Sequence, residues 1–193
     1  MGERRLARLS DAFPLQVERV FTEIHPDTPA LGMPIERLGY PPERWSRMME
    51  SLERMGQAEN IRFARRSFTT NSHRALLLAE AARIIDPGAF EELNERLFRA
   101  YFSEGRNIGD ERVLRQIASE SGLSAESVGR AWDDAAFEER LGAQRRVASA
   151  LGVTGIPTFL IGDIFLLEGA VPLEMLIDAV KRVRSGRRQE DLP

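Results

Sequence analysis

The spacing of apolar residues changes several times along this chain. Residues 2–9 place apolar side chains at helical spacing, which predicts a short helix at the N-terminus. Residues 15–24 (LQVERVFTEI) instead alternate apolar and polar positions and are rich in β-branched residues, which predicts a strand. Three prolines and a glycine in residues 25–34 then mark a loop that ends this first segment of structure.

From residue 35 to residue 151 the apolar residues keep helical spacing almost throughout. Helix ends are marked by Pro42 at a first-turn position, by the stop at residues 86–88 (DPG), by Gly122 and by a Ser124 cap. These signals predict a compact bundle of helices over residues 42–55, 72–85, 89–102, 110–121, a segment from Ser124 onward, and 137–151.

Two of these helices carry distinctive apolar faces. In the first, the soft side chains of Trp45, Met48, Met49, Leu52 and Met55 share one face. Methionine adapts to irregular partners, so this stripe could line a groove for apolar substrates, but we favour ordinary packing in the core. The helix over residues 89–102 is also predicted to contribute to the core, through Phe90, Leu93, Leu97, Phe98, Tyr101 and Phe102.

After residue 151 the period of the apolar residues shortens from helical to two. Residues 158–161 and 164–168 predict two strands joined by a tight glycine-aspartate turn, as in a hairpin. Pro157 has no N–H to donate to a ladder, so it suits the entrance of the first strand. Residues 172–183 predict an amphipathic helix, and the mixed charges of residues 185–193 predict a frayed end.

Together these elements indicate an α/β protein in which an all-helical block interrupts a β-sheet unit. A parallel strand needs a neighbour, and no segment before the first helix could pair with residues 15–24. We therefore expect one strand of the sheet to be missing from this sequence.

Composition excludes several kinds of chemistry. The net charge of -3 provides no basic field for nucleic acid, and no apolar run could span a membrane or act as a signal peptide, so we expect a cytoplasmic protein. The chain has no cysteine, which excludes disulfides, thiolate nucleophiles and cysteine metal sites within it. His25 and His73 are too few for a histidine-rich metal site. We expect no metal and no cofactor.

Several segments of the chain resemble one protein family. They are NIGDERVLRQIASESGL, LFRAYFSEG, RSFTTNSHRALLLAEAA and, most specific, ALGVTGIPTFLIGDIFLLEGAVPLEML. From residue 2 to residue 183 the chain resembles the DsbA-like thioredoxin-fold proteins of the FrnE type, which are related to 2-hydroxychromene-2-carboxylate isomerase and glutathione transferase kappa. The resemblance implies an α/β thioredoxin-like fold with an all-helical insertion: thioredoxin-like residues 1–34 and 151–184, a helical insertion over 35–150 and a flexible tail over 185–193.

The same resemblance implies thiol-disulfide exchange as the family's activity. In the family a Cys-Pro-x-Cys motif lies at the N-terminus of the first helix, where the helix dipole and free N–H groups stabilise a thiolate. Residues 2–6 match the positions just after that motif, so neither the motif nor the strand before it is in this sequence. We therefore expect no catalytic residue in this chain and no redox activity from it.

The resemblance also assigns candidate substrate-binding residues. Gly155, Ile156 and Pro157 match the family's cis-proline loop, in which the residue before the proline offers its backbone to an extended substrate. Asn71 matches an asparagine at the start of the family's helical domain, where a helix cap is the simpler interpretation and a place in the substrate pocket is the alternative. We expect His25 to be solvated and His73 to lie on a helix surface.

Three interpretations of the missing motif stay open. Met1 is an internal methionine of a longer oxidoreductase, which we favour because loss of a central strand would leave many backbone groups unpaired. Alternatively, the chain is a non-catalytic thioredoxin-fold protein-binding module, or a glutathione transferase kappa-like isomerase whose serine also lies upstream. The expected partner is a protein or peptide thiol or disulfide, or else glutathione. An uncovered sheet edge also predicts a homodimer formed by strand exchange.

Overall fold

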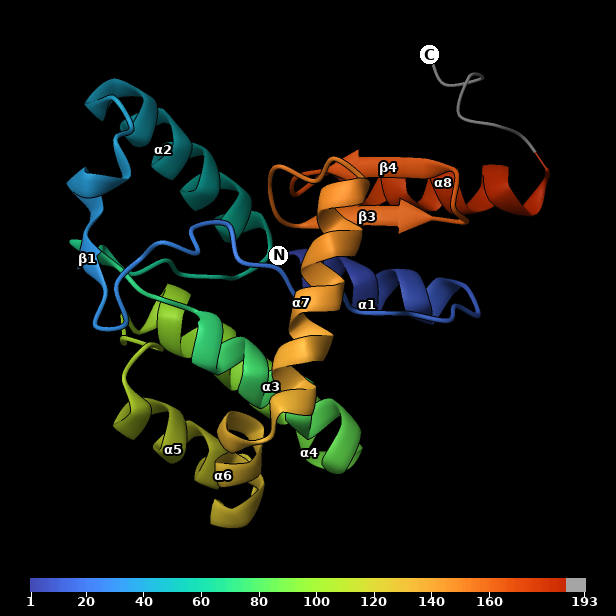
Figure 1. The fold of residues 1–193 in the computed structure, drawn as a ribbon. Helices are drawn as coiled ribbons and strands as arrows, with labels where there is room; N and C mark the ends of the chain where they lie inside the picture. The colour runs from blue at the N-terminus through green and yellow to red at the C-terminus, as the bar shows by residue number, and fades with distance from the viewer. Residues whose placement is uncertain (187–193) are drawn as a thin grey trace. The chain divides into compact units, whose positions relative to one another are not determined.

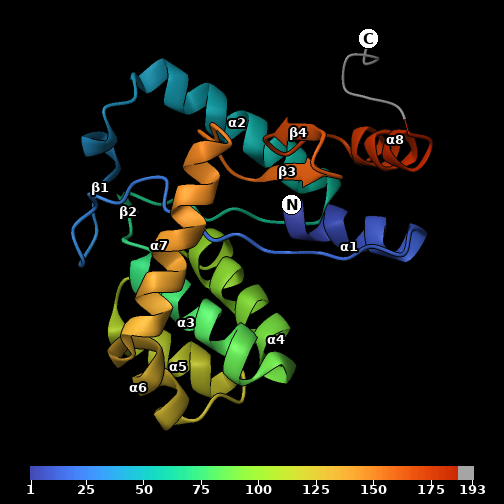
Figure 2. The same cartoon turned by 45° about the vertical axis from the view of Figure 1, so that its right-hand side comes forward.

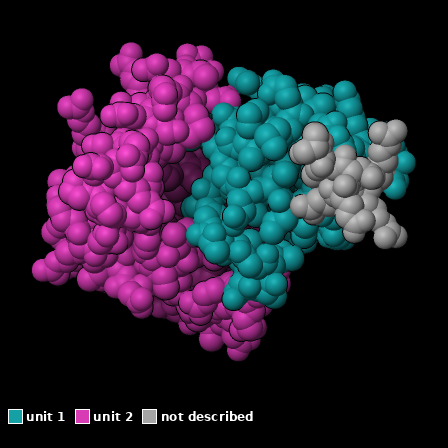
Figure 3. Space-filling model, turned by 90° about the horizontal axis from the view of Figure 1, so that it is seen from above, with its two compact units in different colours: residues 1–19, 148–193 teal, residues 20–147 magenta. Residues whose placement is uncertain are grey.

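The computed structural model describes residues 1–186 and divides the chain into two compact units. Unit 1 contains residues 1–19 and the chain from residue 148 onward, and unit 2 contains residues 20–147 (Figure 3). The predicted frayed tail lies, from residue 187 on, outside the described residues. No helix formed by residues 1–186 has both the length and the apolar character needed to cross a membrane.

Unit 2 is built from helices, as predicted (Figure 1). Three of them begin at a residue whose side chain accepts a hydrogen bond from an N–H of the first turn, namely Asp86, Asp110 and Ser124. The helices are α3 (His73–Ile85), α4 (Pro87–Phe98), the π-helical turn η2 (Arg99–Ser103), α5 (Glu111–Glu120), α6 (Ala125–Asp133) and α7 (Ala135–Ala150), whose last turn belongs to unit 1. α3 packs against α4 and α6, and α5 packs against the same two helices.

The core of unit 2 is large and continuous. Its twenty buried residues include Leu78, Leu93 and Leu114, whose side chains are fully buried. The predicted core face of α4 is confirmed at Leu93 but is wrong at Phe98, which is 46% exposed and stacks on Phe102. A helix turns about 100° per residue, so the side chain of Phe98 points about 100° away from that of Leu97, to a side of the helix that the core does not cover.

The apolar stripe of α2 (Pro42–Ala58) is not part of a core, so the prediction that it packs in the core is wrong. None of Trp45, Met48, Met49, Leu52 and Met55 belongs to either hydrophobic core. Trp45 stacks on Tyr40, and the side of α2 that carries Trp45 and Met49 lines an open groove of about 320 Å³ that residues 64–66 also border. Helical spacing shows that one face of a helix is apolar, but it does not show what covers that face.

A short ladder organises the remaining loops of unit 2. β1 (Met33–Pro34) pairs antiparallel with β2 (Phe68–Thr69). The 3₁₀ turn η1 (Ile35–Leu38) follows β1 and ends at Gly39, whose φ of 74° favours glycine.

Unit 1 contains a helix, a hairpin and a second helix. They are α1 (Gly2–Ala12), β3 (Thr158–Ile161), β4 (Phe165–Glu168) and α8 (Leu173–Arg184). β3 pairs antiparallel with β4, with Thr158 opposite Glu168 and Ile161 opposite Phe165. The turn between them has positive φ at Gly162 and Asp163, which confirms the predicted hairpin.

The core of unit 1 is small. Among the described residues its buried cluster consists of Leu9, Leu176 and Val180, and α1 packs against α8 around them; Phe165 and Ala179 are buried as well. Arg5 is buried as well, and its guanidinium donates hydrogen bonds to the carbonyl oxygens of Ala170 and Val171. This arginine therefore fastens α1 to the chain that leaves β4.

Residues 15–24 do not form a strand, so that prediction is wrong. Among the described residues, β3 pairs only with β4, and no segment forms a ladder with residues 15–24. Alternating residues favour a strand only when a neighbour accepts the backbone hydrogen bonds, and the sheet described here offers none.

The boundary between the units also differs from the predicted one. Residues 20–34, assigned to the thioredoxin-like part by resemblance, belong to unit 2. The reason is visible at Phe21, whose ring packs edge-on against Phe90 and whose N–H donates to Gln144 Oε1. The chain around Phe21 therefore packs against helices of unit 2, which places it in that unit.

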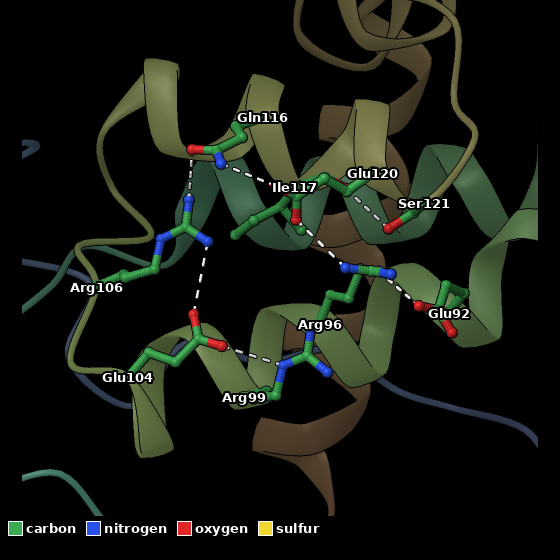
Figure 4. A network of polar contacts seen from close by, with 9 residues as sticks. All are labelled: Glu92, Arg96, Arg99, Glu104, Arg106, Gln116, Ile117, Glu120 and Ser121. Carbon is green, nitrogen blue, oxygen red and sulfur yellow. Dashed lines mark hydrogen bonds and ion pairs between the residues drawn. The ribbon is translucent and has the colours of Figure 1, made fainter.

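Charged side chains tie the helices of unit 2 together in two ways. On an exposed face, Arg96 bridges Glu92 of α4 and Glu120 of α5, and Arg106 bridges Glu104 and Gln116 (Figure 4). In the interior, the Glu80 carboxylate is fully buried and accepts hydrogen bonds from Arg83 and Arg140. The second arrangement joins α3 to α7 and is shielded from solvent on the carboxylate side.

Candidate functional site

The loop before β3 is held against the end of β4. Gly169 N–H donates to Pro157 O over 2.7 Å, and Thr158 Oγ1 donates to Gly155 O over 2.8 Å. The peptide bond between Ile156 and Pro157 is cis. The three residues assigned by resemblance, Gly155, Ile156 and Pro157, thus form one short loop at the entrance of β3.

Ile156 is the exposed member of this loop. The residue is 56% exposed, and neither its N–H nor its C=O makes a hydrogen bond with another described residue. Both backbone groups can therefore pair with a peptide segment that approaches from solvent.

The N-terminus of α1 lies directly against Pro157. A Cβ atom placed on Gly2 would lie 3.0 Å from Pro157 Cβ and 3.5 Å from Phe159 Cζ, so a side chain at residue 2 would crowd the proline. The N-cap residue Met1 makes no side-chain cap, and the first N–H groups of a helix carry a partial positive charge. The loop and the N-terminus of α1 therefore form one site. In it, the partial positive charge of the helix N-terminus lies near the backbone of Ile156, whose N–H and C=O bond to no other described residue.

This site can position a substrate, but its own side chains supply no nucleophile. A helix N-terminus lowers the pKa of a thiol placed there, yet the sequence has no cysteine at any position. Within residues 1–186 no group of three or more His, Asp or Glu side chains is arranged to hold a metal ion. What the described residues of this site offer a ligand is hydrogen bonding by the backbone of Ile156.

Asn71 belongs to unit 2 and acts as a local brace. Its Oδ1 accepts the N–H of His73 in the first turn of α3, and its Nδ2 donates to Thr28 O over 2.6 Å. These bonds match the capping interpretation of this residue, and they also fasten the loop over residues 25–32 to the start of α3.

His73 is more than a residue on a helix surface. Its Nδ1 lies 3.3 Å from Glu23 and its Nε2 lies 2.9 Å from Glu138, while Arg145 reaches the same Glu23 carboxylate at 3.7 Å. Together with Asn71, three of these residues line a cavity of about 310 Å³. Sequence reasoning missed this cluster because its members lie 50 and 65 residues from His73.

Next to this cavity, Arg74 pairs with Glu111 of α5. Hydrogen bonds from Arg115 and then from Arg74 hold the pKa of Glu111 below its usual value. The charged side chains around the cavity are thus paired with one another, which indicates that they brace the loop and the helices.

Comparison with known proteins agrees with this arrangement. A model of the DSBA-like thioredoxin domain matches residues 2–181. The chain belongs to this family. The DsbA-like family and the thioredoxin-like fold with a helical insertion, both expected from resemblance, are confirmed.

Individual relatives agree with the family. The uncharacterized protein YwbO of Bacillus subtilis is 32% identical over 90 residues, which cover 46% of this chain and 44% of that protein. A probable DsbA oxidoreductase from Streptomyces coelicolor has a structure that superimposes with a TM-score of 0.83 at 24% identity, over 100% of this chain and 87% of that chain. This structural likeness shows a shared fold.

Proposed function

We propose that this chain is a cysteine-free, FrnE-type member of the DsbA-like family that binds extended segments of protein substrates without exchanging disulfides itself. The observation that carries the proposal is the backbone of Ile156, an exposed residue whose N–H and C=O bond to no other described residue, next to Pro157 at the tip of α1. Residues of two sequence-distant segments converge there, and no described residue pairs with the N–H or C=O of Ile156, which a peptide backbone could therefore bind.

Disulfide exchange requires a thiolate that attacks one sulfur and displaces the other. The chain has none to offer, because it lacks cysteine. The chain does contain the N-terminus of α1 and the loop over residues 155–157. These can bind a substrate segment, or a thiol that belongs to another molecule.

Docking at Ile156 would work by β-augmentation. An extended peptide that pairs with one N–H and one C=O gains main-chain hydrogen bonds whatever its side chains are, so recognition would be broad. Each such bond contributes about 1 kcal/mol net, which predicts weak and reversible binding.

The first test is catalytic. In an assay that follows the reduction of insulin by dithiothreitol, this chain is expected to leave the rate at the level of dithiothreitol alone, because it has no thiol to relay electrons. A DsbA-type enzyme that contains the Cys-x-x-Cys motif serves as the positive control. Turnover that rises with the concentration of this chain would contradict the proposal.

The second test is binding. When carboxymethylated insulin B chain is titrated into ¹⁵N-labelled protein, the amide resonance of Ile156 is expected to shift and that of Ile164, in the hairpin turn, to stay in place. Because the contact uses backbone groups, Ile156→Ala should bind as the unmodified chain does, whereas Ile156→Pro, which lacks the N–H, should bind about tenfold more weakly.

A different pattern would contradict docking through the backbone. Equal losses in the alanine and proline variants would show that the side chain of Ile156 makes the contact. A shift confined to residues outside the loop would place the peptide elsewhere on the molecule.

A further inference from the structure

The open groove of unit 2 lies between α2 and the segment that follows it, residues 59–67, which returns toward β2 (Figures 1 and 2). A Cβ atom placed on Gly56 would lie 2.6 Å from the ring of Phe63 and 2.7 Å from Ile61 O, so the absence of a side chain at residue 56 allows helix and segment to approach. Hydrogen bonds from Ile61 N–H to Gly56 O and from Ala64 N–H to Phe102 O hold the returning segment. The groove is therefore preformed.

The apolar side chains that line this groove are half-buried and belong to neither hydrophobic core. They are Ile35, Trp45, Met49 and Ala64. Trp45 stacks on Tyr40 with the ring centroids 6.0 Å apart, and Met49 lies one helical turn after it. An aromatic ring and a thioether outside any core provide an adaptable apolar surface of the kind that lines ligand sites.

Charged side chains of opposite sign come from the two sides of the groove. α2 contributes Glu50 and Glu53, and the returning segment contributes Arg65 and Arg66. None of the four side chains makes a hydrogen bond or an ion pair with another described residue. Arg66 contacts aromatic rings, with its guanidinium carbon 3.9 Å from the ring centroid of Tyr101. On the exposed face of α4, in contrast, charged side chains pair with one another (Figure 4).

These charges select the kind of ligand. Two carboxylates and two guanidiniums have no net charge together, so an anion such as phosphate is attracted by one side of the groove and repelled by the other. A molecule with a positive group at one end and a negative group at the other is attracted by both sides. The acidic and basic side chains do not reach each other across the groove, so the two charges of the ligand must lie further apart than those of one amino acid.

The size of the groove distinguishes a small molecule from a protein. Nine described residues line it, whereas a stable protein interface uses about 20–30 residues on each side. Its volume of about 320 Å³ is instead that of a small-ligand site.

We propose that this groove binds a free peptide of two or three residues that carries an apolar side chain. The N-terminal ammonium of the peptide pairs with the two carboxylates of α2. Its C-terminal carboxylate pairs with the two guanidiniums, which bind carboxylates through paired N–H groups, and its apolar side chain packs on Trp45. All the residues that line the groove belong to unit 2, so this proposal does not depend on docking at Ile156 in unit 1.

The test titrates leucyl-phenylalanine into ¹⁵N-labelled protein. The amide resonances of Met49 and Ala64 are expected to shift, while those of α5, none of whose residues lines the groove, stay in place. Acetylation of the peptide N-terminus removes its positive charge, and amidation of its C-terminus removes its negative charge. Each change is expected to weaken binding about fivefold, the factor that one exposed charge pair supplies.

Variants of the exposed charges show which side of the groove binds which end of the peptide. Glu50→Gln and Glu53→Gln, combined in one chain, should abolish the effect of acetylation and leave that of amidation. Arg65→Gln should reduce the effect of amidation and leave that of acetylation. Glu43→Gln on α2 and Arg62→Gln on the returning segment are matched controls, because neither residue lines the groove, and both should bind as the unmodified chain does.

Three results would overturn the proposal. The first is an absence of shifts at Met49 and Ala64 with the peptide at about 10 mM, measured on the unmodified chain. The second is equal binding of the free peptide and of the peptide blocked at both ends, which would leave an apolar contact alone. The third is binding of inorganic phosphate, or of leucine alone, at least as tight as that of the dipeptide, which would assign the groove to an anion or to a single amino acid.

Discussion

Replacement of Arg83 by alanine is expected to lower the free energy of unfolding of unit 2 by about 3 kcal/mol. Arg83 donates three of the four hydrogen bonds that the buried Glu80 carboxylate accepts, and the fourth comes from Arg140. Without Arg83 a fully buried negative charge keeps a single partner, which costs much more than the loss of an exposed ion pair. Urea unfolding followed by tryptophan fluorescence measures the change, because both tryptophans lie in unit 2.

Arg96 provides a matched control for this prediction. It too lies on a helix and pairs with two carboxylates, those of Glu92 and Glu120, but both are exposed (Figure 4). Arg96→Ala should therefore cost about 1 kcal/mol or less. Adding Glu80→Met to the Arg83→Ala chain should recover part of the loss, because it removes the buried charge. Equal costs for Arg83→Ala and Arg96→Ala would contradict the assigned role of burial.

Replacement of Phe165 by alanine is expected to destabilise unit 1 by about 3–5 kcal/mol. Phe165 is the largest fully buried side chain in the part of the chain that the structure describes, and it belongs to a unit with few buried residues to compensate for a cavity. Hydrogen exchange measured by mass spectrometry is expected to show faster exchange in peptides that cover β3, β4 and α8, with little change in α3 and α4.

The neighbouring residue Ile164 supplies the comparison. This residue is 37% exposed, so Ile164→Ala should change exchange in the same peptides only slightly, with a cost of about 1 kcal/mol or less. If the two variants exchange alike, Phe165 does not hold unit 1 together. If Phe165→Ala speeds exchange equally in both units, the two do not unfold separately.

The elements predicted well were those with local signals. The hairpin was predicted to within a residue because its turn residues adopt positive φ and its entrance carries a proline, features that act over a few neighbouring positions. The cap at Ser124 and the helix start near Asp110 were predicted for the same reason, since a cap bonds to an N–H two or three residues away. At residues 86–88, in contrast, only the end of α3 was predicted, whereas Asp86 also caps α4, which begins at Pro87 and not at residue 89. Resemblance to a family then pointed to Gly155, Ile156 and Pro157, which the structure brings together in one loop.

What local signals could not predict was the partner of each apolar or charged face. Residues 15–24 alternate as a strand does, but a strand exists only when a second one accepts its hydrogen bonds, and none among the described residues does. The stripe on α2 is apolar at helical spacing and still belongs to no core. His73 pairs with Glu23 and Glu138 because two segments far from it in the sequence, around residue 23 and in α7, pass beside the start of α3.

The amino-acid order of this protein was thus sufficient for the positions of its helices, the hairpin and the absence of a thiol, because propensity, capping and composition act within a few residues. The fold in space decided which faces are covered and which backbone groups stay unpaired: the backbone of Ile156, the edge of β3 and the surroundings of Glu80. The physical reason is that burial, and hydrogen bonding between distant segments, depend on the path of the whole chain.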